Sequence, residues 1–339
     1  MKILKEKRLF ILSNNIHYIN AKNYIRTHKE GENHLIFLNK FSKGHQEFID
    51  EIKKDRDFKS IKIIANNQNQ KFPKGFLKTI SFIKNVRGLK GHFGNNIEKI
   101  FISNYLSWQQ HYILKQFHTN QIILINDGTA IFKTIELRET SKIINFSHIN
   151  FLIKSFLGTT KINNLHFYSP IKVPVAQYDS IEIFNFEASK SSQVNSKKVY
   201  FIGSPLVELN YLKLNHHLSY LTTIKNIFPD AQITYFAHRG EKDRFLEKYD
   251  YFGKVVKDTI SFEERLRQEK VLPGYILSYA SSILINLPQV YPQINFSYFP
   301  LEEDGIPDNS SFKSIYPPLI DNFERMKSSN FDILQVKKT

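Results

Sequence analysis

Short apolar runs alternate with amphipathic segments along most of this chain, and that alternation restricts the folds open to it. The runs are rich in isoleucine, leucine and phenylalanine, which is typical of strands buried on both faces of a parallel sheet. The segments between them, such as Phe76–Val86, place apolar residues at helical spacing. Strands that alternate with helices predict an α/β fold with a largely parallel sheet. The strands expected in the first half are Arg8–Ser13, His34–Leu38, Ile61–Ala65, Lys99–Ser103 and Ile122–Ile125.

The alternation is interrupted at Ala188–Lys198, a segment rich in serine, lysine and asparagine that we interpret as a linker. Before it we expect helix over Phe146–Ile171 and a last strand at Ser180–Phe186. After it the expected strands are Val199–Ile202, Gln232–Phe236, Val255–Lys257, Tyr275–Ser278 and Ile294–Tyr298. The sequence therefore predicts two Rossmann-like domains with parallel sheets facing across a cleft, at 1–190 and 198–315. Residues 316–339 are expected to form a C-terminal helix, within the tail Ser314–Val336, that packs back on the first domain.

Composition excludes several classes of protein. The 339 residues include no cysteine, which rules out disulfides, thiolate nucleophiles and cysteine-ligated zinc. No apolar window is long enough to span a membrane, and Leu9–Leu12 is too short for a secretion signal, so we expect a cytoplasmic protein. The net charge of +15 suits an anionic partner such as a membrane face, an acidic glycan or nucleic acid. A nucleic-acid-binding protein is the minor alternative, because no RNP-like, KH-like or helix-turn-helix pattern is visible.

Asn126-Asp127-Gly128 directly follows the apolar run Ile122–Ile125. Ligands of open α/β sheets bind at the carboxyl ends of the strands, so a carboxylate presented there is a candidate general base. Asp-Gly is also a common turn dipeptide, and an ordinary turn stays open as the alternative.

Polar residues also follow three segments in the second half of the chain. His238-Arg239 comes after the expected strand Gln232–Phe236, and both side chains suit a phosphate, with an ordinary surface histidine as the alternative. Ser281-Ser282 lies between a strand and an expected helix start, where hydroxyls either bind an anion or cap the helix. Glu263 lies at the start of another expected helix. Its carboxylate either accepts hydrogen bonds from ribose hydroxyls or caps the N-terminus of that helix.

In their order and spacing, these motifs resemble those of bacterial GT-B sialyltransferases that use CMP-sialic acid. The resemblance is closest to families of capsule polysialyltransferases and lipooligosaccharide sialyltransferases. Such enzymes carry an acidic-acidic-Gly motif, a His-Pro motif and a Ser-Ser/Thr motif, and Asn126-Asp127-Gly128, His238-Arg239 and Ser281-Ser282 stand in those places. Asn126 replaces the first acidic residue and Arg239 replaces the proline, which leaves the exact donor sugar open.

The resemblance implies an inverting, metal-independent glycosyltransferase that needs no cofactor. It transfers sialic acid, or a related keto-sugar acid, from a CMP-activated donor to a lipopolysaccharide or capsule glycan. It implies Asp127 as general base and His238 as general acid or phosphate stabiliser. The other expected site residues are Ser281, Ser282, Glu263, Arg239, Gly203 and Ser204 for the donor, and Asn126 and Gly128 on the acceptor side. Asn14 and Asn15, in the loop after the first expected strand, are also expected on the acceptor side, because amides suit sugar hydroxyls; a buried turn is the alternative for that loop. A CMP-Kdo-dependent transferase and an inert nucleotide-sugar-binding homologue are the alternatives, and Asp55-Arg56-Asp57 is interpreted as a solvated loop instead of a magnesium site.

Overall fold

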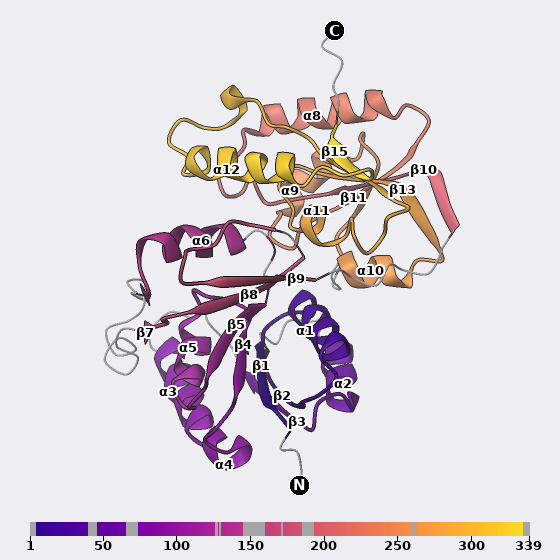
Figure 1. Cartoon of the computed structure of the whole chain (residues 1–339). Helices are drawn as coiled ribbons and strands as arrows, with labels where there is room; N and C mark the ends of the chain where they lie inside the picture. The colour runs from indigo at the N-terminus through magenta and orange to yellow at the C-terminus, as the bar shows by residue number, and fades with distance from the viewer. Residues whose placement is uncertain are drawn as a thin grey trace. The chain divides into compact units, whose positions relative to one another are not determined.

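A computed structural model describes residues 5–39, 46–65, 74–125, 128, 130–144, 160–170, 172–184, 193–258 and 262–334. The chain divides into two compact units, Met1–Phe184 (unit 1) and Asn185–Thr339 (unit 2), each built on its own parallel sheet (Figure 1). Among the described residues, no helix has both the length and the apolar composition that crossing a bilayer requires.

Unit 1 contains a seven-stranded parallel sheet in the order β3-β2-β1-β4-β5-β8-β9. Its central strands are aliphatic and almost fully buried, as expected for strands covered on both faces. Helices α1 and α2 lie on one side of this sheet, and α3 and α5 lie on the other (Figure 1). The strands are β1 (Lys7–Leu12), β2 (Glu32–Asn39), β3 (Ser60–Ala65), β4 (Lys99–Ile102), β5 (Gln121–Ile125), β8 (Leu165–Ser169) and β9 (Ser180–Ile183), with β6 (Ile143–Ile144) and β7 (Thr160–Lys161) as a separate pair. The helices are α1 (Asn15–Thr27), α2 (Gln46–Lys54), α3 (Lys74–Arg87), α4 (Leu89–Phe93), α5 (Trp108–Leu114) and α6 (Ala130–Thr140).

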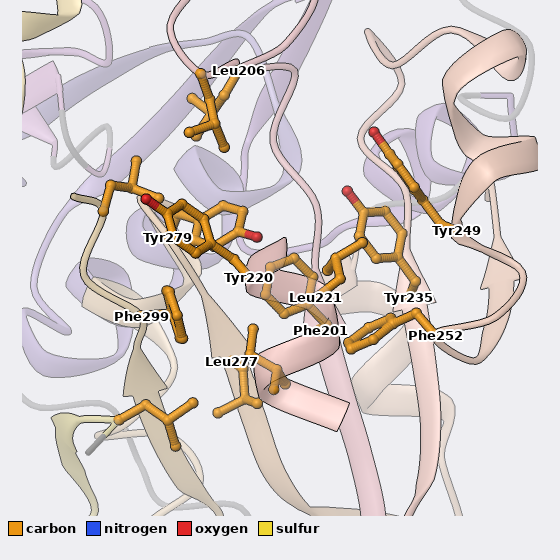
Figure 2. Close-up of a cluster of buried hydrophobic side chains, with 14 of the residues drawn as sticks. Phe201, Leu206, Tyr220, Leu221, Tyr235, Tyr249, Phe252, Leu277, Tyr279 and Phe299 are labelled. Carbon is orange, nitrogen blue, oxygen red and sulfur yellow. The ribbon is translucent and has the colours of Figure 1, made fainter. Parts of the chain in front are cut away.

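Unit 2 contains a six-stranded parallel sheet in the order β12-β11-β10-β13-β14-β15. Its core is strongly aromatic: Phe201 and Tyr235 from the sheet, and Tyr279 from a loop directly after a strand, pack with Tyr220 and other side chains of α8 (Figure 2). The strands are β10 (Gln193–Ile202), β11 (Gln232–Phe236), β12 (Lys254–Val256), β13 (Val271–Ser278), β14 (Asn295–Tyr298) and β15 (Phe331–Ile333). The helices are α8 (Leu214–Ile227), α9 (Asp243–Leu246), α10 (Phe262–Gln268), α11 (Ile283–Asn286) and α12 (Phe312–Arg325), with the 3-10 turns η1 (Glu247–Tyr249) and η2 (Glu303–Gly305).

The predicted alternation of strands and helices is confirmed, and every strand range expected from the sequence overlaps an observed strand. Ser180–Phe186 holds the edge strand β9. Three expectations are wrong in part. Phe146–Ile171 was expected to be helical, and residues 146–159 and 171 of that range lie outside the described residues. The described part holds β8, whose Phe167 and Tyr168 are buried between the neighbouring strands β5 and β9.

The first half of the expected linker Ala188–Lys198 lies outside the described residues, and its second half is not a linker, because β10 begins at Gln193. Gln193–Asn195, in which valine lies between two polar residues, pairs with Val271–Pro273 of β13, so strand pairing overrides the weak strand propensity of the polar residues. The expected C-terminal helix ends at Arg325, and Phe331–Ile333 instead forms β15, which adds to the sheet of unit 2 beside β14. α12 packs within unit 2, where Phe323 contacts Tyr298 and Phe331.

Each sheet has one point where the strand order reverses. In unit 2 the chain runs outward from β10 through β11 to β12, then returns to place β13 on the other side of β10. In unit 1 the same reversal lies between β1 and β4. The loops after the two strands diverge at such a point and leave a crevice at the carboxyl edge, which is where open α/β sheets bind ligands.

Candidate functional site

Three of the sequence-predicted motifs lie at the carboxyl edge of the unit 2 sheet. Ile202, at the end of β10, pairs with Phe236 of β11 on one side and with Ser278 of β13 on the other. The loops that carry Ser204, His238 and Ser281 therefore leave the sheet at one level, from neighbouring strands about 4.8 Å apart. The structure thus brings the three motifs to the point where the strand order reverses.

His238 lies in the loop after β11, where its side chain is exposed. The main-chain N–H of Gly240 donates to Nδ1 of His238 at 3.0 Å, so the proton of the neutral ring resides on Nε2. The partial burial of the ring and then the charge of Arg239 lower the pKa of His238, and Glu208 opposes them. At neutral pH the site therefore presents an uncharged imidazole with an Nε2–H donor.

Arg239 is also exposed, and among the described residues no carboxylate forms an ion pair with it. Its guanidinium is therefore available to an anion beside His238. A phosphate at this edge would meet a neutral donor and a fixed positive charge from adjacent residues.

Gly203 opens the loop after β10, and its neighbours leave no room for a side chain. A Cβ atom at this position would lie 2.3 Å from Oε2 of Glu241 and 2.8 Å from the hydroxyl of Tyr235. Glycine is thus required here by close approach, with its N–H donating to the carbonyl of Phe236 at 2.8 Å. Glu241 was not among the predicted site residues; its position three residues after His238 was the only sequence signal for it.

Ser281 and Ser282 are half-buried in the loop between β13 and α11. The hydroxyl of Ser281 accepts from the N–H of Ile283 at 3.3 Å, and Ser282 occupies the N-cap position without a side-chain capping bond. The expected helix is a single turn, Ile283–Asn286. Any anion recognition here therefore depends on the hydroxyl groups and not on a long helix.

Glu263 is the second residue of α10 and is half-buried. Its neighbour Phe262 anchors the helix by edge contacts with Tyr200 and Phe236, at ring distances of 6.1 and 5.1 Å. Because α10 follows β12, its first turn belongs to the same carboxyl edge as His238. The role of Glu263 toward a nucleoside stays a prediction.

The acceptor-side residues belong to unit 1, and they are only partly described. Asn126 and Asp127 lie outside the described residues, so the base assignment stays a prediction. Gly128 is buried with φ +61°, which agrees with the expected sharp turn after β5. Asn14 caps α1, since its Oδ1 accepts from the N–H of His17 at 2.9 Å, and Asn15 is the first residue of that helix.

A polar network at the carboxyl edge of the unit 1 sheet was not expected from the sequence. The side chain of Gln110 accepts from the N–H of Ser103 at 2.8 Å and donates to its hydroxyl at 2.9 Å. The Ser103 hydroxyl donates to the carbonyl of Ile11 at 3.2 Å. These buried bonds connect the carboxyl ends of β1 and β4, the two strands that flank the reversal point.

Two groups of carboxylates bear on the question of a metal. Asp55 and Asp57 both pair with Lys22, so they neutralise a lysine, and the Asp55 carboxylate is largely buried instead of fully solvated as expected. His216, Glu302 and Asp304 place one potential ligand atom each within 4.8 Å of one another, with both carboxylates exposed. Exposed groups of this kind also occur without an ion, and metal independence stays a prediction.

A family model described as alpha-2,8-polysialyltransferase (POLYST) matches residues 8–299. No curated protein sequence matches the chain.

Solved structures with low sequence identity share the fold. A putative UDP-N-acetylglucosamine 2-epimerase from Listeria monocytogenes is 9% identical, with a TM-score of 0.52, over 95% of this chain and 89% of that chain. UDP-GlcNAc 2-epimerase from Neisseria meningitidis, bound to UDP-GlcNAc, is 11% identical, with a TM-score of 0.51, over 93% and 85%. TcCGT1 in complex with UDP is 10% identical, with a TM-score of 0.51, over 98% and 86%. At these identities the likeness shows the GT-B fold alone.

Proposed function

The chain belongs to the alpha-2,8-polysialyltransferase family, and from that premise we propose that it transfers sialic acid or a related keto-sugar acid from a CMP-activated donor to a glycan hydroxyl. Its membership and its GT-B fold make it a glycosyltransferase of the sialyltransferase type. The donor, the acceptor and the residue roles are the proposal. A lipopolysaccharide or capsule glycan is the acceptor class that we propose.

One observation supports the proposal most strongly: the loops of Ser204, His238 and Ser281 meet where the strand order of unit 2 reverses. The leaving group of a CMP-sugar is a phosphate, and this edge offers it hydroxyls, an imidazole donor and Arg239. We assign Gly203, Ser204, Ser281, Ser282 and Arg239 to the phosphate side of the donor, and Glu263 to the nucleoside.

In the proposed reaction, the Asp127 carboxylate accepts the proton of the acceptor hydroxyl as its oxygen attacks the anomeric carbon. The bond from that carbon to the phosphate oxygen breaks, and the electron pair leaves with CMP. The Nε2–H of His238 stabilises the charge that develops on the phosphate. Attack opposite the leaving group inverts the anomeric configuration, and the positively charged transition state requires a base and a leaving-group stabiliser only.

A panel of CMP-activated sugars tests this function. We expect wild-type protein to release CMP from CMP-sialic acid or a close relative in the presence of glycan acceptor. His238→Asn keeps a polar side chain but loses the Nε2–H donor, so its rate should fall by about 10²-fold. The control His216→Asn, which changes a half-buried histidine of the same unit, should match wild type with and without a chelator.

Turnover of CMP-Kdo alone would establish the alternative of a CMP-Kdo-dependent transferase. CMP binding without turnover of any donor would establish the inert homologue. A loss of activity in His216→Asn that a divalent cation restores would contradict metal independence.

We also propose that unit 1 contacts an anionic membrane face. Residues 58–97 contain eight lysines and arginines and no acidic residue. Within the described structure, no carboxylate pairs with Lys62, Lys78, Lys84, Arg87 or Lys90. Each basic residue near an anionic surface contributes about 1 kcal/mol to binding, and salt weakens that contribution.

Vesicle flotation tests this contact. The protein should float with phosphatidylglycerol vesicles at low salt, and it should remain unbound at high salt or with phosphatidylcholine. Arg87→Glu/Lys90→Glu should weaken binding about tenfold or more, whereas the matched unit 2 change Lys248→Glu/Lys254→Glu should not. Failure to bind the anionic vesicles at low salt, or preferential binding of RNA, would contradict the proposal.

A further inference from the structure

The carboxylate of Glu241 is buried at the carboxyl edge of the unit 2 sheet, and only 3% of the residue is exposed. Its Oε1 accepts from the hydroxyl of Tyr235 at 2.6 Å, and its Oε2 accepts from the main-chain N–H of His238 at 2.5 Å. The N–H of Glu241 in turn donates to the carbonyl of His238 at 2.9 Å. One residue therefore closes the turn of residues 238–241 through both its side chain and its main chain.

The same carboxylate also lies directly over Gly203. Its Oε2 occupies space only 2.3 Å from where a Cβ of residue 203 would be, and Pro205 lies beside Gly240 of the facing turn. Glu241 is thus packed between the loop after β10 and the loop after β11. These two loops contain Ser204 and His238, the residues that we assign to the donor phosphate.

We propose that Glu241 is a positioning residue for His238, because its buried carboxylate holds the His238 turn against the Gly203 loop and so fixes where the imidazole meets the donor phosphate. The inference depends on the function proposed for His238. Gly240, whose N–H directs the proton of His238 to Nε2, lies inside the turn that Glu241 closes. Loss of the carboxylate would therefore disturb both the place and the orientation of the imidazole.

The surroundings of Glu241 allow both of its charge states near neutral pH. Burial is the largest cause that raises the pKa of Glu241, and the charge of Glu208 adds to it, whereas the bonds from Tyr235 and His238 and the charge of Lys257 lower it. The net result is a pKa of about 7. Either form keeps both contacts, because a protonated oxygen can donate to the Tyr235 hydroxyl. The ionisable groups around this carboxyl are Tyr235, His238, Glu208, Lys257, Tyr249 and Tyr279.

The test compares Glu241→Ala with Glu241→Gln in the full chain. Glu241→Ala leaves the His238 N–H without its acceptor, so kcat for CMP release should fall by about 10- to 100-fold while the Kd for CMP changes much less. Glu241→Gln is isosteric: its amide oxygen accepts from His238 and its amide nitrogen donates to Tyr235. It should recover most of the lost kcat and remove any dependence of kcat on ionisation near pH 7.

Glu269→Ala is the matched control. The Glu269 carboxylate likewise accepts a tyrosine hydroxyl of the same sheet, that of Tyr200 at 2.9 Å, but it makes no contact with His238. Its kcat should equal that of wild type. An equal loss in Glu269→Ala would indicate a general effect on stability and would overturn the positioning role.

Further outcomes separate the two proposals. Full activity of His238→Asn would refute the function proposed for His238, whereas an impaired His238→Asn beside a fully active Glu241→Ala would refute only the role of Glu241. If thermal melts show that Glu241→Ala does not fold, Tyr235→Phe replaces it, since it removes one of the two donors to the carboxylate. Its kcat should fall by about threefold to tenfold, and an unchanged kcat would overturn the proposal.

Discussion

Asp127→Asn should lower the rate of CMP release by about 10²- to 10⁴-fold, because an amide cannot accept the proton of the acceptor hydroxyl. The residue follows β5, a central strand of unit 1 whose last three residues are buried. It precedes Gly128, whose φ of +61° turns the chain sharply after the strand. Donor binding is assigned to unit 2, so the Kd for CMP should stay close to the wild-type value.

Steady-state CMP release with saturating donor and acceptor measures this effect. Glu136→Gln is the matched control, since Glu136 is an exposed carboxylate of unit 1 that pairs with Lys133 at 2.8 Å. A wild-type rate in Asp127→Asn would refute the base assignment. Rescue of the variant by a small carboxylic acid such as formate would support it further.

Arg138→Met should destabilise unit 1 by about 3–5 kcal/mol, because it leaves a buried carboxylate uncompensated. The Arg138 side chain is fully buried and bidentate to Asp179, at 2.9 Å from Nε and 2.6 Å from Nη2. It also donates to the carbonyl of Ile162 at 2.7 Å, and Asp179 accepts from the N–H of Leu165 at 2.8 Å. The pair thus joins α6 to the segment that leads into β8.

Urea denaturation followed by tryptophan fluorescence measures this change in unit 1 alone. Trp108, the single tryptophan of the chain, lies in α5 and packs edge-on against Phe82 at 5.4 Å. The double variant Arg138→Met/Asp179→Asn should be more stable than the sum of the single changes predicts, because it leaves no unpaired charge. A destabilisation below about 1 kcal/mol in Arg138→Met would show that the pair behaves like a surface ion pair.

Local elements were predicted well where one residue pattern decides them. The strand Gln232–Phe236 has the expected bounds, because apolar spacing and flanking polar residues act over a few residues only. The expected positions of His238 and Gly203 just past strand ends were confirmed for the same reason.

Elements whose partners are distant in sequence were predicted poorly. The apolar residues of Leu165–Ser169 follow neither helical nor strand spacing clearly. The segment forms a strand because it pairs with β5 on one side and with β9 on the other. Gln193–Asn195 belongs to a segment polar enough to resemble a linker, yet its pairing with β13 makes it part of a strand. Non-local pairing of this kind leaves little trace in the residues themselves.

The sequence by itself determined the order of strands and helices, the absence of cysteine chemistry and the placement of polar motifs after strands, because periodicity and turn chemistry are local properties. Only the tertiary structure decided which of those motifs meet. β10 lies between β11 and β13, although residues 203–270 separate it from β13 in the sequence, and that neighbourhood brings Gly203 and His238 to the loop of Ser281. The Glu241 carboxylate over Gly203 follows from the same pairing, since a contact between loops of different strands depends on how the strands are ordered.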